Sequence, residues 1–443
     1  MKRVFLETYG CQMNVADSEL MAGVLERAGM ELVPRPDEAD AVILNTCAIR
    51  EHAELRVLGR LGEFAHLKMK NPALVVGVAG CMAQHLRKKL LDTKRVLDLV
   101  VGPDGYRDLP NLLKSAAGAP VAEIRLDRDE TYGDLEPKRV AGVRAWVTVQ
   151  RGCDKFCTYC VVPYTRGRER SIPLADLVRQ VEHAAARGFC EIVFLGQTVN
   201  SWKHDTNDFA DLLRAANGVA GVKRIRFTSP HPSDMTDRVI AAMAECEKVM
   251  PHVHLPLQSG SDRVLDAMNR TYDMATFRDV VAKLRARVPK MALSTDVIVG
   301  FPGETEEEFE MTSAYLKEAR FDSAFLFKYS ARPDTKAFKW PETVTEDEKG
   351  RRLTRLIDEQ MAISAEINDA LLGAEVEVLV ENVSHRDGTQ LYGKSAEFKT
   401  VVFTDDGTQP GELARVKVVG TTPVTLLGES LKKPRQVPLV TIG

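Results

Sequence analysis

The chain has 443 residues, of which 44 % are hydrophobic and 28 % charged, and its formal net charge is −3. This is the composition of a globular protein of two to four domains, and the near-neutral charge gives no support to a uniformly basic nucleic-acid binder. The sequence contains no run of about 20 apolar residues, as a membrane helix would need, and its N-terminal apolar run is too short for a secretory signal. We therefore expect a cytoplasmic protein without a membrane anchor, in which clustered cysteines are metal or redox ligands.

Residues 1–118 alternate apolar runs with amphipathic stretches. VFLETYG, AVILNT and ALVVGVAG are strand candidates, and ADSELMAGVLERAG is typical of the helices between them. The alternation predicts a parallel α/β domain. The polar stretch that follows, residues 119–138, is the predicted linker.

Three cysteines in this domain, Cys11, Cys47 and Cys81, each close one of the predicted strands. Ligands of an open parallel sheet bind at the carboxyl ends of its strands, so three such thiols can converge there. The alternative is that they are packing residues, because a free cysteine behaves as a small hydrophobe. We interpret Cys190 and Cys246, further along the chain, in that second way.

A second alternation of strands and helices covers residues 139–372. Its strand candidates are VRAWVTVQ, EIVFLGQ, RIRFTS, HVHLPLQS, MALSTDVIVGF and SAFLFKYS. Six strand–helix units are too few for a closed eight-fold barrel but enough for a partial (βα)6 barrel resembling part of a TIM barrel. A long charged helix over residues 344–372 ends this domain.

Cys153, Cys157 and Cys160 follow the first strand of this domain with C-x3-C-x2-C spacing. Zinc usually takes four ligands, drawn as C-x2-C pairs, whereas three close thiolates without a fourth fit a 4Fe–4S cluster with one open iron. S-adenosylmethionine can chelate an open iron, and one electron then cleaves it to a radical. The spacing, Tyr159 and the partial barrel resemble the radical S-adenosylmethionine superfamily. With this cluster in one half, the N-terminal cysteines are expected to hold a second one.

Polar residues at the carboxyl ends of barrel strands are the natural cofactor ligands. The predicted cofactor-binding residues are Gln197, Asn200, Ser229, Gln258, Asp296 and Arg332. Any of them can instead be a satisfied loop residue. Residues 138–170 carry eight basic and two acidic side chains, and we expect Arg166, Arg168 and Arg170 to bind a phosphate-rich substrate. A solvated surface is the alternative.

Residues 373–438 change to short alternating strands separated by glycine-containing turns. Five strand candidates, among them AEVEVLVENVS and ELARVKVVGTT, predict a small β-barrel. Its eight basic and nine acidic side chains nearly balance, so charge gives no support for RNA binding by this domain.

Several stretches resemble one family, the methylthiotransferases, over essentially the whole chain. The stretches are TYGCQMN around Cys11, LNTCAIREHAE around Cys47, YCVVPYTRGRERS from Tyr159, LGQTVNSW from Leu195, FTSPHP from Phe227, HLPLQSGSDRVL from His254 and IVGFPGE from Ile298. Within that family, GCQMN and VVPYTRGRERS are similar to the MiaB group of tRNA enzymes.

The resemblance implies a flavodoxin-like N-terminal domain, a radical S-adenosylmethionine core and a C-terminal TRAM domain. It implies methylthiolation of N6-isopentenyladenosine at position 37 of tRNA, next to the anticodon, with one S-adenosylmethionine as methyl donor and one as radical source. Cys153, Cys157 and Cys160 would bind the radical 4Fe–4S cluster, and Cys11, Cys47 and Cys81 the auxiliary, sulfur-delivering one. The implied partners are the tRNA anticodon stem-loop, a flavodoxin- or ferredoxin-type reductant and a sulfur donor system, with the enzyme itself a monomer.

Three alternatives remain at this point. A sister methylthiotransferase acting on a ribosomal protein or on threonylcarbamoyladenosine would use the same cysteines. A non-catalytic iron–sulfur electron carrier would need no open iron and no polar residues at the strand ends. A zinc-stabilised RNA-binding module would contain zinc and no sulfide.

Overall fold

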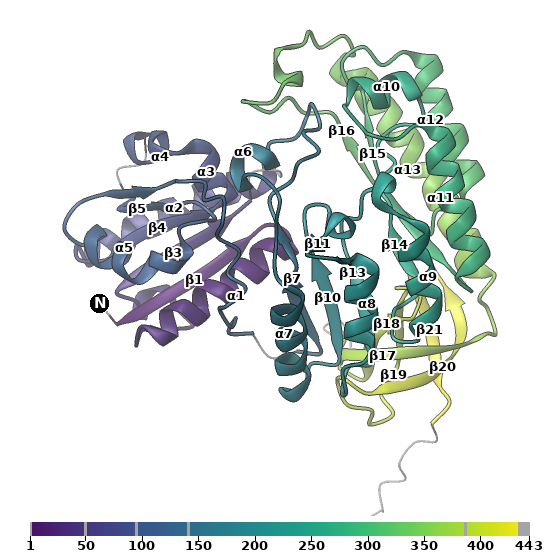
Figure 1. The fold of residues 1–443 in the computed structure, drawn as a ribbon, viewed down its shortest axis with the longest axis horizontal. Helices are drawn as coiled ribbons and strands as arrows, with labels where there is room; N and C mark the ends of the chain where they lie inside the picture. Colours follow the sequence, from purple (N-terminus) through teal and green to yellow (C-terminus); the bar gives the residue numbers. More distant parts are fainter. Residues whose placement is uncertain (1, 48–50, 94–95, 140–141, 385–387, 433–443) are drawn as a thin grey trace, which may run out of the picture.

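The computed structural model describes residues 2–47, 51–93, 96–139, 142–384 and 388–432, which form three successive parts (Figure 1). Residues 48–50 of the motif around Cys47, residues 140–141, and residues 433–438 of the predicted C-terminal domain lie outside this description. Within it, no helix is long and apolar enough to span a membrane.

The N-terminal part is a parallel sheet covered by helices on both faces. Its strands are β1 (Arg3–Tyr9), β2 (Glu31–Leu32), β3 (Ala41–Thr46), β4 (Val75–Gly80), β5 (Leu99–Val101) and β6 (Val121–Glu123), in the order β2-β1-β3-β4-β5-β6. Its helices are α1 (Gln12–Arg27), α2 (Glu51–Lys70), α3 (Cys81–Leu86), α4 (Lys88–Thr93) and α5 (Leu109–Ala116). The order 2-1-3-4-5 is that of the flavodoxin fold, which confirms the prediction. The sheet also extends into the predicted linker, because β6 pairs with β5 there.

Alternate residues of the central strands face the two helical layers. Ile43 of β3 packs in one core cluster with helix α1, whereas Val42 and Leu44 pack in a second cluster with helix α2. Every residue of β3 and β4 is buried, as expected of strands covered on both faces.

The central part is an open barrel made of two three-stranded parallel sheets. The first sheet contains β7 (Arg144–Thr148), β10 (Glu191–Leu195) and β13 (Arg224–Phe227), and the second contains β14 (His252–His254), β15 (Ala292–Val299) and β16 (Ser323–Lys328). Between them, an isolated parallel bridge pairs Ile225 of β13 with Val249, three residues before β14. All six predicted strands are confirmed.

Seven helices form the outer layer of this barrel (Figure 1): α7 (Leu174–Ala186), α8 (Phe209–Asn217), α9 (Asp237–Glu245), α10 (Asp262–Ala267), α11 (Met274–Arg287), α12 (Glu306–Ala319) and α13 (Glu346–Asp369). They bury one set of alternate strand residues, such as Ile192, Phe194 and Val297, in the largest apolar cluster of the protein. The other set points to the concave inner face of the barrel, so this face decides what the barrel can hold.

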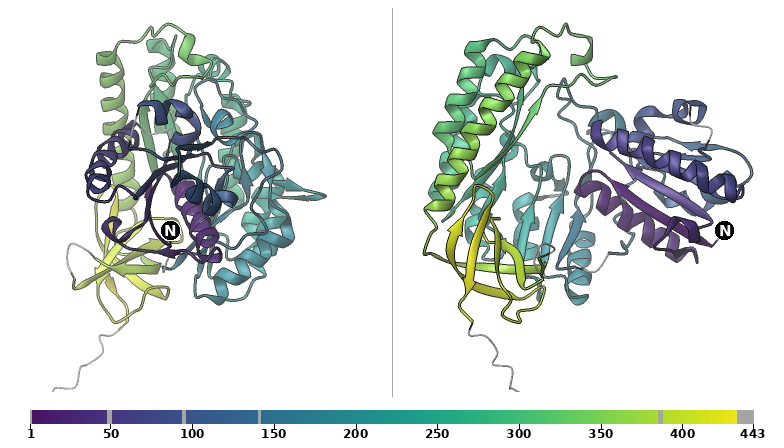
Figure 2. Two further views of the ribbon diagram at one scale, coloured as in Figure 1. Left: turned by 90° about the vertical axis from the view of Figure 1, so that its left-hand side faces the viewer. Right: turned by 180° about the vertical axis from the view of Figure 1, so that it is seen from behind.

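Helix α1 of the N-terminal part packs against the inner face of the first sheet. Met13 and Ala16 of α1 form one buried cluster with Val193 and Leu195 of β10. The Met13 sulfur also lies 3.6 Å from the Thr148 hydroxyl of β7. The N-terminal part is therefore seated on the concave side of half of the barrel, as the view from behind also shows (Figure 2).

The C-terminal part is the predicted closed β-barrel. Its strands are β17 (Glu375–Val383), β18 (Gln390–Ser395), β19 (Thr400–Thr404), β20 (Leu413–Thr421) and β21 (Thr425–Ser430), closed in the order β17-β18-β19-β21-β20. Arg224, at the amino end of β13, donates hydrogen bonds to the carbonyls of Lys394 (2.7 Å) and Glu377 (3.2 Å). This small barrel is thus attached to the amino ends of the central strands.

Candidate functional site

Cys11, Cys47 and Cys81, here called the N-terminal cysteine set, lie together at the carboxyl edge of the first part's sheet. They follow three adjacent strands that end in register, because Thr46 of β3 pairs with Tyr9 of β1 and Gly80 of β4. Cys11 caps the amino end of α1, and Cys81 is the first residue of α3. Convergence of strand ends in a parallel sheet therefore brings the three thiols to one place.

Close backbone contacts hold these loops. Gly10 has φ +146°, and a Cβ there would lie 2.7 Å from the Cβ of Cys47, so only glycine allows this approach. Asn14 donates from its side chain to the carbonyl of Thr46 (3.2 Å), and Asn45 donates to the carbonyl of Asn14 (2.7 Å). These asparagines give a role to the last residue of GCQMN and to the Asn of LNTC, which sequence reasoning left without one.

The pKa values of two thiols of this set depend on neighbouring groups, and the buried guanidinium of Arg166 acts on both thiols. The pKa of Cys11 is lowered to about 6, chiefly by a hydrogen bond from the Cys47 thiol and also by the Arg166 guanidinium. Burial raises the pKa of Cys81, and Arg166 opposes that rise. Iron binds thiolates rather than thiols, so a nearby fixed cation suits a site of this kind.

Cys153, Cys157 and Cys160, the central cysteine set, lie in the loop between β8 (Gln150–Arg151) and α6 (Val162–Arg166). The loop turns back on itself, since Cys160 donates its backbone N–H to the carbonyl of Cys157 (3.0 Å). Burial, together with the neighbouring Cys157 and Cys153 thiols, raises the pKa of Cys160 to about 12. The guanidinium of Arg270 lies 3.5 Å from the Cys157 sulfur.

Among the described residues, no three His, Cys, Asp or Glu side chains are grouped tightly enough for a single metal ion. A 4Fe–4S cube binds each thiolate through a different iron, so its ligands need not meet at one point. The chemistry of both donor sets, three thiols and no carboxylate, fits such a cube better than a single hard cation.

Arg166 connects the two cysteine sets. It ends the helix that begins after Cys160, and its Nε donates to the sulfur of Cys81 across 3.1 Å. Its other arm binds Asp17 of α1 at 2.8 Å, and Asp17 also accepts a 2.8 Å bond from Arg151. All three charged side chains are at most 4 % exposed. Asp17 went unnoticed in the sequence, because it stands next to Ser18 and Glu19 and reads there as one residue of an ordinary polar turn of the helix.

The three arginines predicted to bind substrate have different environments. Arg166 is buried as described, and Arg170 is buried in a pair with Asp104 (2.9 Å). Arg168 is 66 % exposed, pairs with Asp154 and lies over the ring of Phe156. Burial speaks against phosphate contact by the first two, and substrate binding stays a prediction for Arg168.

Two of the predicted cofactor residues and two further residues beside them have polar atoms without a partner. Within the described ranges, the Oε1 atoms of Gln197 and Gln258, the Nε2 of His231 and the hydroxyl of Tyr329 are buried without a hydrogen-bond partner. All four follow strands of the central barrel. Buried polar groups are normally satisfied, so unpartnered ones at the carboxyl ends of strands fit a polar ligand such as S-adenosylmethionine.

The backbone at two of these positions is strained. Ser229 and Gln258 have φ of +57° and +66°, a region costly for residues other than glycine. Asn200, by contrast, is satisfied within the protein, because its amide bonds both the N–H (2.7 Å) and the carbonyl (2.9 Å) of His231. Asp296 lies within β15 on the inner face and pairs with His254 at 3.1 Å, and Arg332 is half-buried beyond β16.

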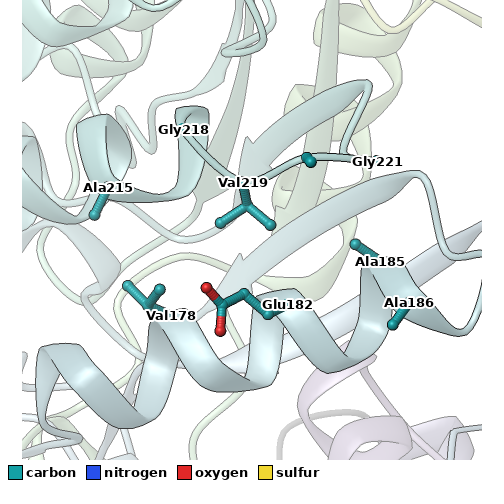
Figure 3. A pocket seen from close by; sticks show the side chains of 9 residues that line it. Val178, Glu182, Ala185, Ala186, Ala215, Gly218, Val219 and Gly221 are labelled. Atoms are coloured by element: carbon teal, nitrogen blue, oxygen red, sulfur yellow. The ribbon is translucent and has the colours of Figure 1, made fainter.

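A surface depression of about 640 Å³ lies elsewhere, between α7 and α8 (Figure 3). Its lining consists of small apolar residues and Glu182, on the outer helical layer. It contains none of the cysteines or unpartnered polar atoms described above, so its size gives it no part in the site.

Comparison with known proteins divides the chain in the same three parts. The family descriptions "Uncharacterized protein family UPF0004", "Radical SAM superfamily" and "TRAM domain" match residues 3–102, 147–316 and 369–431. The chain is 43 % identical over 444 residues to the tRNA-2-methylthio-N(6)-dimethylallyladenosine synthase of Porphyromonas gingivalis, with 98 % of this chain and 96 % of the relative covered. The enzyme of the same name from Bacteroides thetaiotaomicron is 44 % identical over 439 residues, with 97 % and 96 % covered.

Solved structures support the fold. The radical S-adenosylmethionine methyltransferase TsrM from Kitasatospora setae aligns with a TM-score of 0.59 at 14 % identity, over 84 % of this chain and 79 % of that one. The cobalamin-dependent radical enzyme OxsB aligns with a TM-score of 0.54 at 11 % identity, over 82 % and 56 %. At such identities the likeness concerns the arrangement of the chain alone.

Proposed function

The chain belongs to the family of tRNA-2-methylthio-N(6)-dimethylallyladenosine synthases, and we propose that it adds a methylthio group to N6-dimethylallyladenosine at position 37 of tRNA. The observation that carries this proposal is the contact of Cys81 with Arg166 and Val161, which directly follow the central cysteine set, in a chain about 43 % identical to these enzymes along its whole length. Sulfur delivery and radical formation act on the same carbon atom of the substrate, so their two sites must lie close to each other. The contact at Arg166 supports such closeness.

The proposed cofactors are two 4Fe–4S clusters and S-adenosylmethionine. Cys153, Cys157 and Cys160 would hold the radical cluster, and Cys11, Cys47 and Cys81 the auxiliary one. The bound groups would supply the electron, the radical that activates an unreactive ring C–H bond, and the methyl and sulfur atoms.

The chain's own residues would bind and orient these groups. The unpartnered Oε1 atoms of Gln197 and Gln258 can accept hydrogen bonds from the amino group or the ribose hydroxyls of S-adenosylmethionine. Arg270 lies at the Cys157 sulfur and can offset the negative charge of a thiolate-bound cluster. Helix α1 covers the inner face of the first sheet beside Cys11 and excludes water from that side of the site.

The finer assignments belong to the same proposal. The auxiliary-cluster domain covers residues 1–118, the radical core 139–372 and the TRAM domain 373–438, with the linker between the first two. A flavodoxin- or ferredoxin-type protein would supply electrons, and a separate sulfur donor would refill the auxiliary cluster. The enzyme would act in the cytoplasm as a monomer on the anticodon stem-loop.

The experiment uses anaerobically reconstituted protein, dithionite, S-adenosylmethionine and tRNA that carries dimethylallyladenosine but no methylthio group. Mass spectrometry of the digested tRNA should reveal the 2-methylthio nucleoside. Cys157→Ala should abolish deoxyadenosine formation, whereas Cys47→Ala should retain it and lose the methylthio product. Cys246→Ala, a buried cysteine in neither set, is the matched control and should behave like the wild type.

If the wild type forms deoxyadenosine but no methylthio product, the protein is a radical enzyme whose substrate is that of a sister methylthiotransferase. Neither product, with both clusters measured as present, would favour an electron carrier. Methylthio product from Cys47→Ala at the wild-type rate would remove the auxiliary role from the N-terminal set.

A further inference from the structure

The second sheet exposes an aromatic inner face. Register pairs Asp296 with Phe325 and Ile298 with Phe327, so these side chains share one side of the sheet. The opposite side carries Leu326 and Val297, which pack under the helices. The inner face of this sheet, here called the lumen face, therefore consists of His254, Asp296, Ile298, Phe325 and Phe327.

The two phenylalanines are unusually open to solvent. Phe325 is 58 % exposed and Phe327 is 47 % exposed, although both lie within a strand of the central domain. Helices α12 and α13 lie on the other side of β16 and cannot cover them (Figure 1). Large neighbouring apolar side chains left exposed in a concave face are typical of a ligand site.

The lumen face is part of the same concave surface as the cysteine sets. Helix α1, which begins at Cys11, occupies the inner face of the first sheet. The lumen face belongs to the neighbouring sheet of the same open barrel. Gln258, whose side-chain Oε1 is unpartnered, donates its backbone N–H to the carbonyl of Asp296 (2.8 Å). A base brought to the cysteine sets would thus have the lumen face beside it.

One polar pair interrupts the apolar surface. His254 bonds Asp296 (3.1 Å) and the Ser294 hydroxyl (3.0 Å), and its ring packs edge-on against Phe325 at 5.7 Å. The face thus combines an apolar strip with a hydrogen-bonding edge. Adenine with a branched five-carbon substituent on N6 has the same two parts, a polar ring edge and an apolar tail.

We infer that Phe325 and Phe327 hold the dimethylallyl tail of the target adenine and so select the isopentenylated tRNA. This inference rests on the proposed function and assigns its specificity to two side chains. Transfer of the tail from water to the phenylalanines favours the modified base, whereas unmodified adenosine gains nothing from them. A charged N6 substituent, such as threonylcarbamoyl, would lose its hydration there.

The test measures binding of two anticodon stem-loop RNAs that differ only in the N6-dimethylallyl group. Fluorescence anisotropy with the full-length reconstituted enzyme should give a dissociation constant about 10-fold lower for the modified RNA, which corresponds to about 1.4 kcal/mol. In the double variant Phe325→Ser/Phe327→Ser the ratio should fall to about 1, with binding of the unmodified RNA unchanged. Met361→Ser, at a similarly exposed apolar position on the outer helix α13, should keep the wild-type ratio.

A second double variant, Phe325→Leu/Phe327→Leu, separates tail contact from ring stacking. Leucines keep an apolar surface and should retain most of the 10-fold preference. Loss of the preference with leucine as well as serine would mean that apolar contact with the tail does not produce it, and would overturn the inference.

Two further outcomes are distinguishable. Wild-type enzyme that makes the methylthio product but binds both RNAs equally, or serine variants that keep the 10-fold ratio, would overturn the inference and leave the proposed function intact. Wild-type enzyme that cleaves S-adenosylmethionine but makes no methylthio product from the modified RNA would overturn the proposed function, and the inference with it.

Discussion

The two sheets of the central barrel share one architecture but use their inner faces differently. In the first sheet, Val193 and Leu195 are buried under Met13 and Ala16 of α1. In the second, Phe325 and Phe327 face the same concave side and are about half exposed. The first face is used for assembly of the protein, and the second is left for a ligand.

The difference shows how an exposed apolar surface can be recognised as a ligand site. Exposure is informative where an equivalent surface of the same protein is covered by another element of the chain. A helix of this protein already covers one half of the concave face, and the charges of Asp17, Arg151 and Arg166 fix it there. On the other half, Phe325 and Phe327 remain about half exposed among the described residues. Substitutions on the covered half and on the open half test this contrast.

Asp17→Ala should give the largest loss of stability, because Asp17 holds α1 against the first sheet. It leaves Arg151 and Arg166 buried without their shared carboxylate, and loss of one partner from a buried ion pair costs about 3–5 kcal/mol. Urea unfolding followed by circular dichroism measures this loss. Asp37→Ala, whose carboxylate is 56 % exposed beside Arg35, is the control and should change stability by less than about 1 kcal/mol. Equal losses in both variants would contradict the role given to Asp17.

Leu195→Ala and Phe325→Ala compare the two faces directly. Leu195 is 1 % exposed under α1, so its truncation should cost about 3 kcal/mol. Phe325 is 58 % exposed, and its truncation should change stability by about 0.5 kcal/mol or less. Urea unfolding followed by tryptophan fluorescence reports on the central domain, since Trp146, Trp202 and Trp340 all lie there. A large cost at Phe325 would mean that the lumen face is structural.

His231, at the carboxyl end of the first sheet, should make stability depend on pH. Burial, with Arg270 and Lys155 nearby, lowers its pKa to about 2, whereas in the unfolded chain it is near 6.5. Between these values the unfolded state binds the extra proton, so its contribution is complete above pH 6.5 and is lost as pH falls. The slope is up to about 1.4 kcal/mol per pH unit.

The measurement is the free energy of unfolding between pH 6.5 and 5.0, in the wild type and in His231→Gln. The variant should have the shallower slope. An identical slope in both proteins would show that His231 is protonated in the folded state.

Arg168→Ala should have the smallest structural effect. Its side chain is 66 % exposed and its pair with Asp154 lies in solvent, so stability should change by less than about 0.5 kcal/mol. If Arg168 contacts a phosphate, RNA binding should weaken and the dependence of log K on log salt should fall by about 1. Arg278→Ala on the outer helix α11 is the control and should leave the salt dependence unchanged. An unchanged slope in Arg168→Ala would remove it from the RNA-binding surface.

Much of the fold followed from periodicity, and much of the site from cysteine positions. The strands of the open barrel and of the C-terminal barrel were predictable because each is a short β-branched or aliphatic run bounded by glycine or polar residues. Convergence of Cys11, Cys47 and Cys81 was predictable because parallel strands end at one edge.

What escaped sequence reasoning depends on contacts between distant segments. The charge of Arg166 suggests a phosphate ligand until Asp17, 149 positions earlier, is placed against it. The exposure of Phe325 depends on α1 covering one sheet and not the other, which no local pattern encodes. The strand β6 was hidden in a polar stretch because three residues are too few for a periodicity.

The attachment of the C-terminal barrel sets a length requirement on any RNA that contacts it and the site together. Arg224 fixes that barrel at the amino ends of the central strands, while both cysteine sets lie toward the carboxyl ends. A strand of five residues spans roughly 17 Å, so the two regions are separated by at least that distance. A single nucleotide is too short to reach both. An RNA bound at two points must supply a rigid segment between them, so the length of the stem, and not only the sequence of the loop, becomes a property that the enzyme can measure.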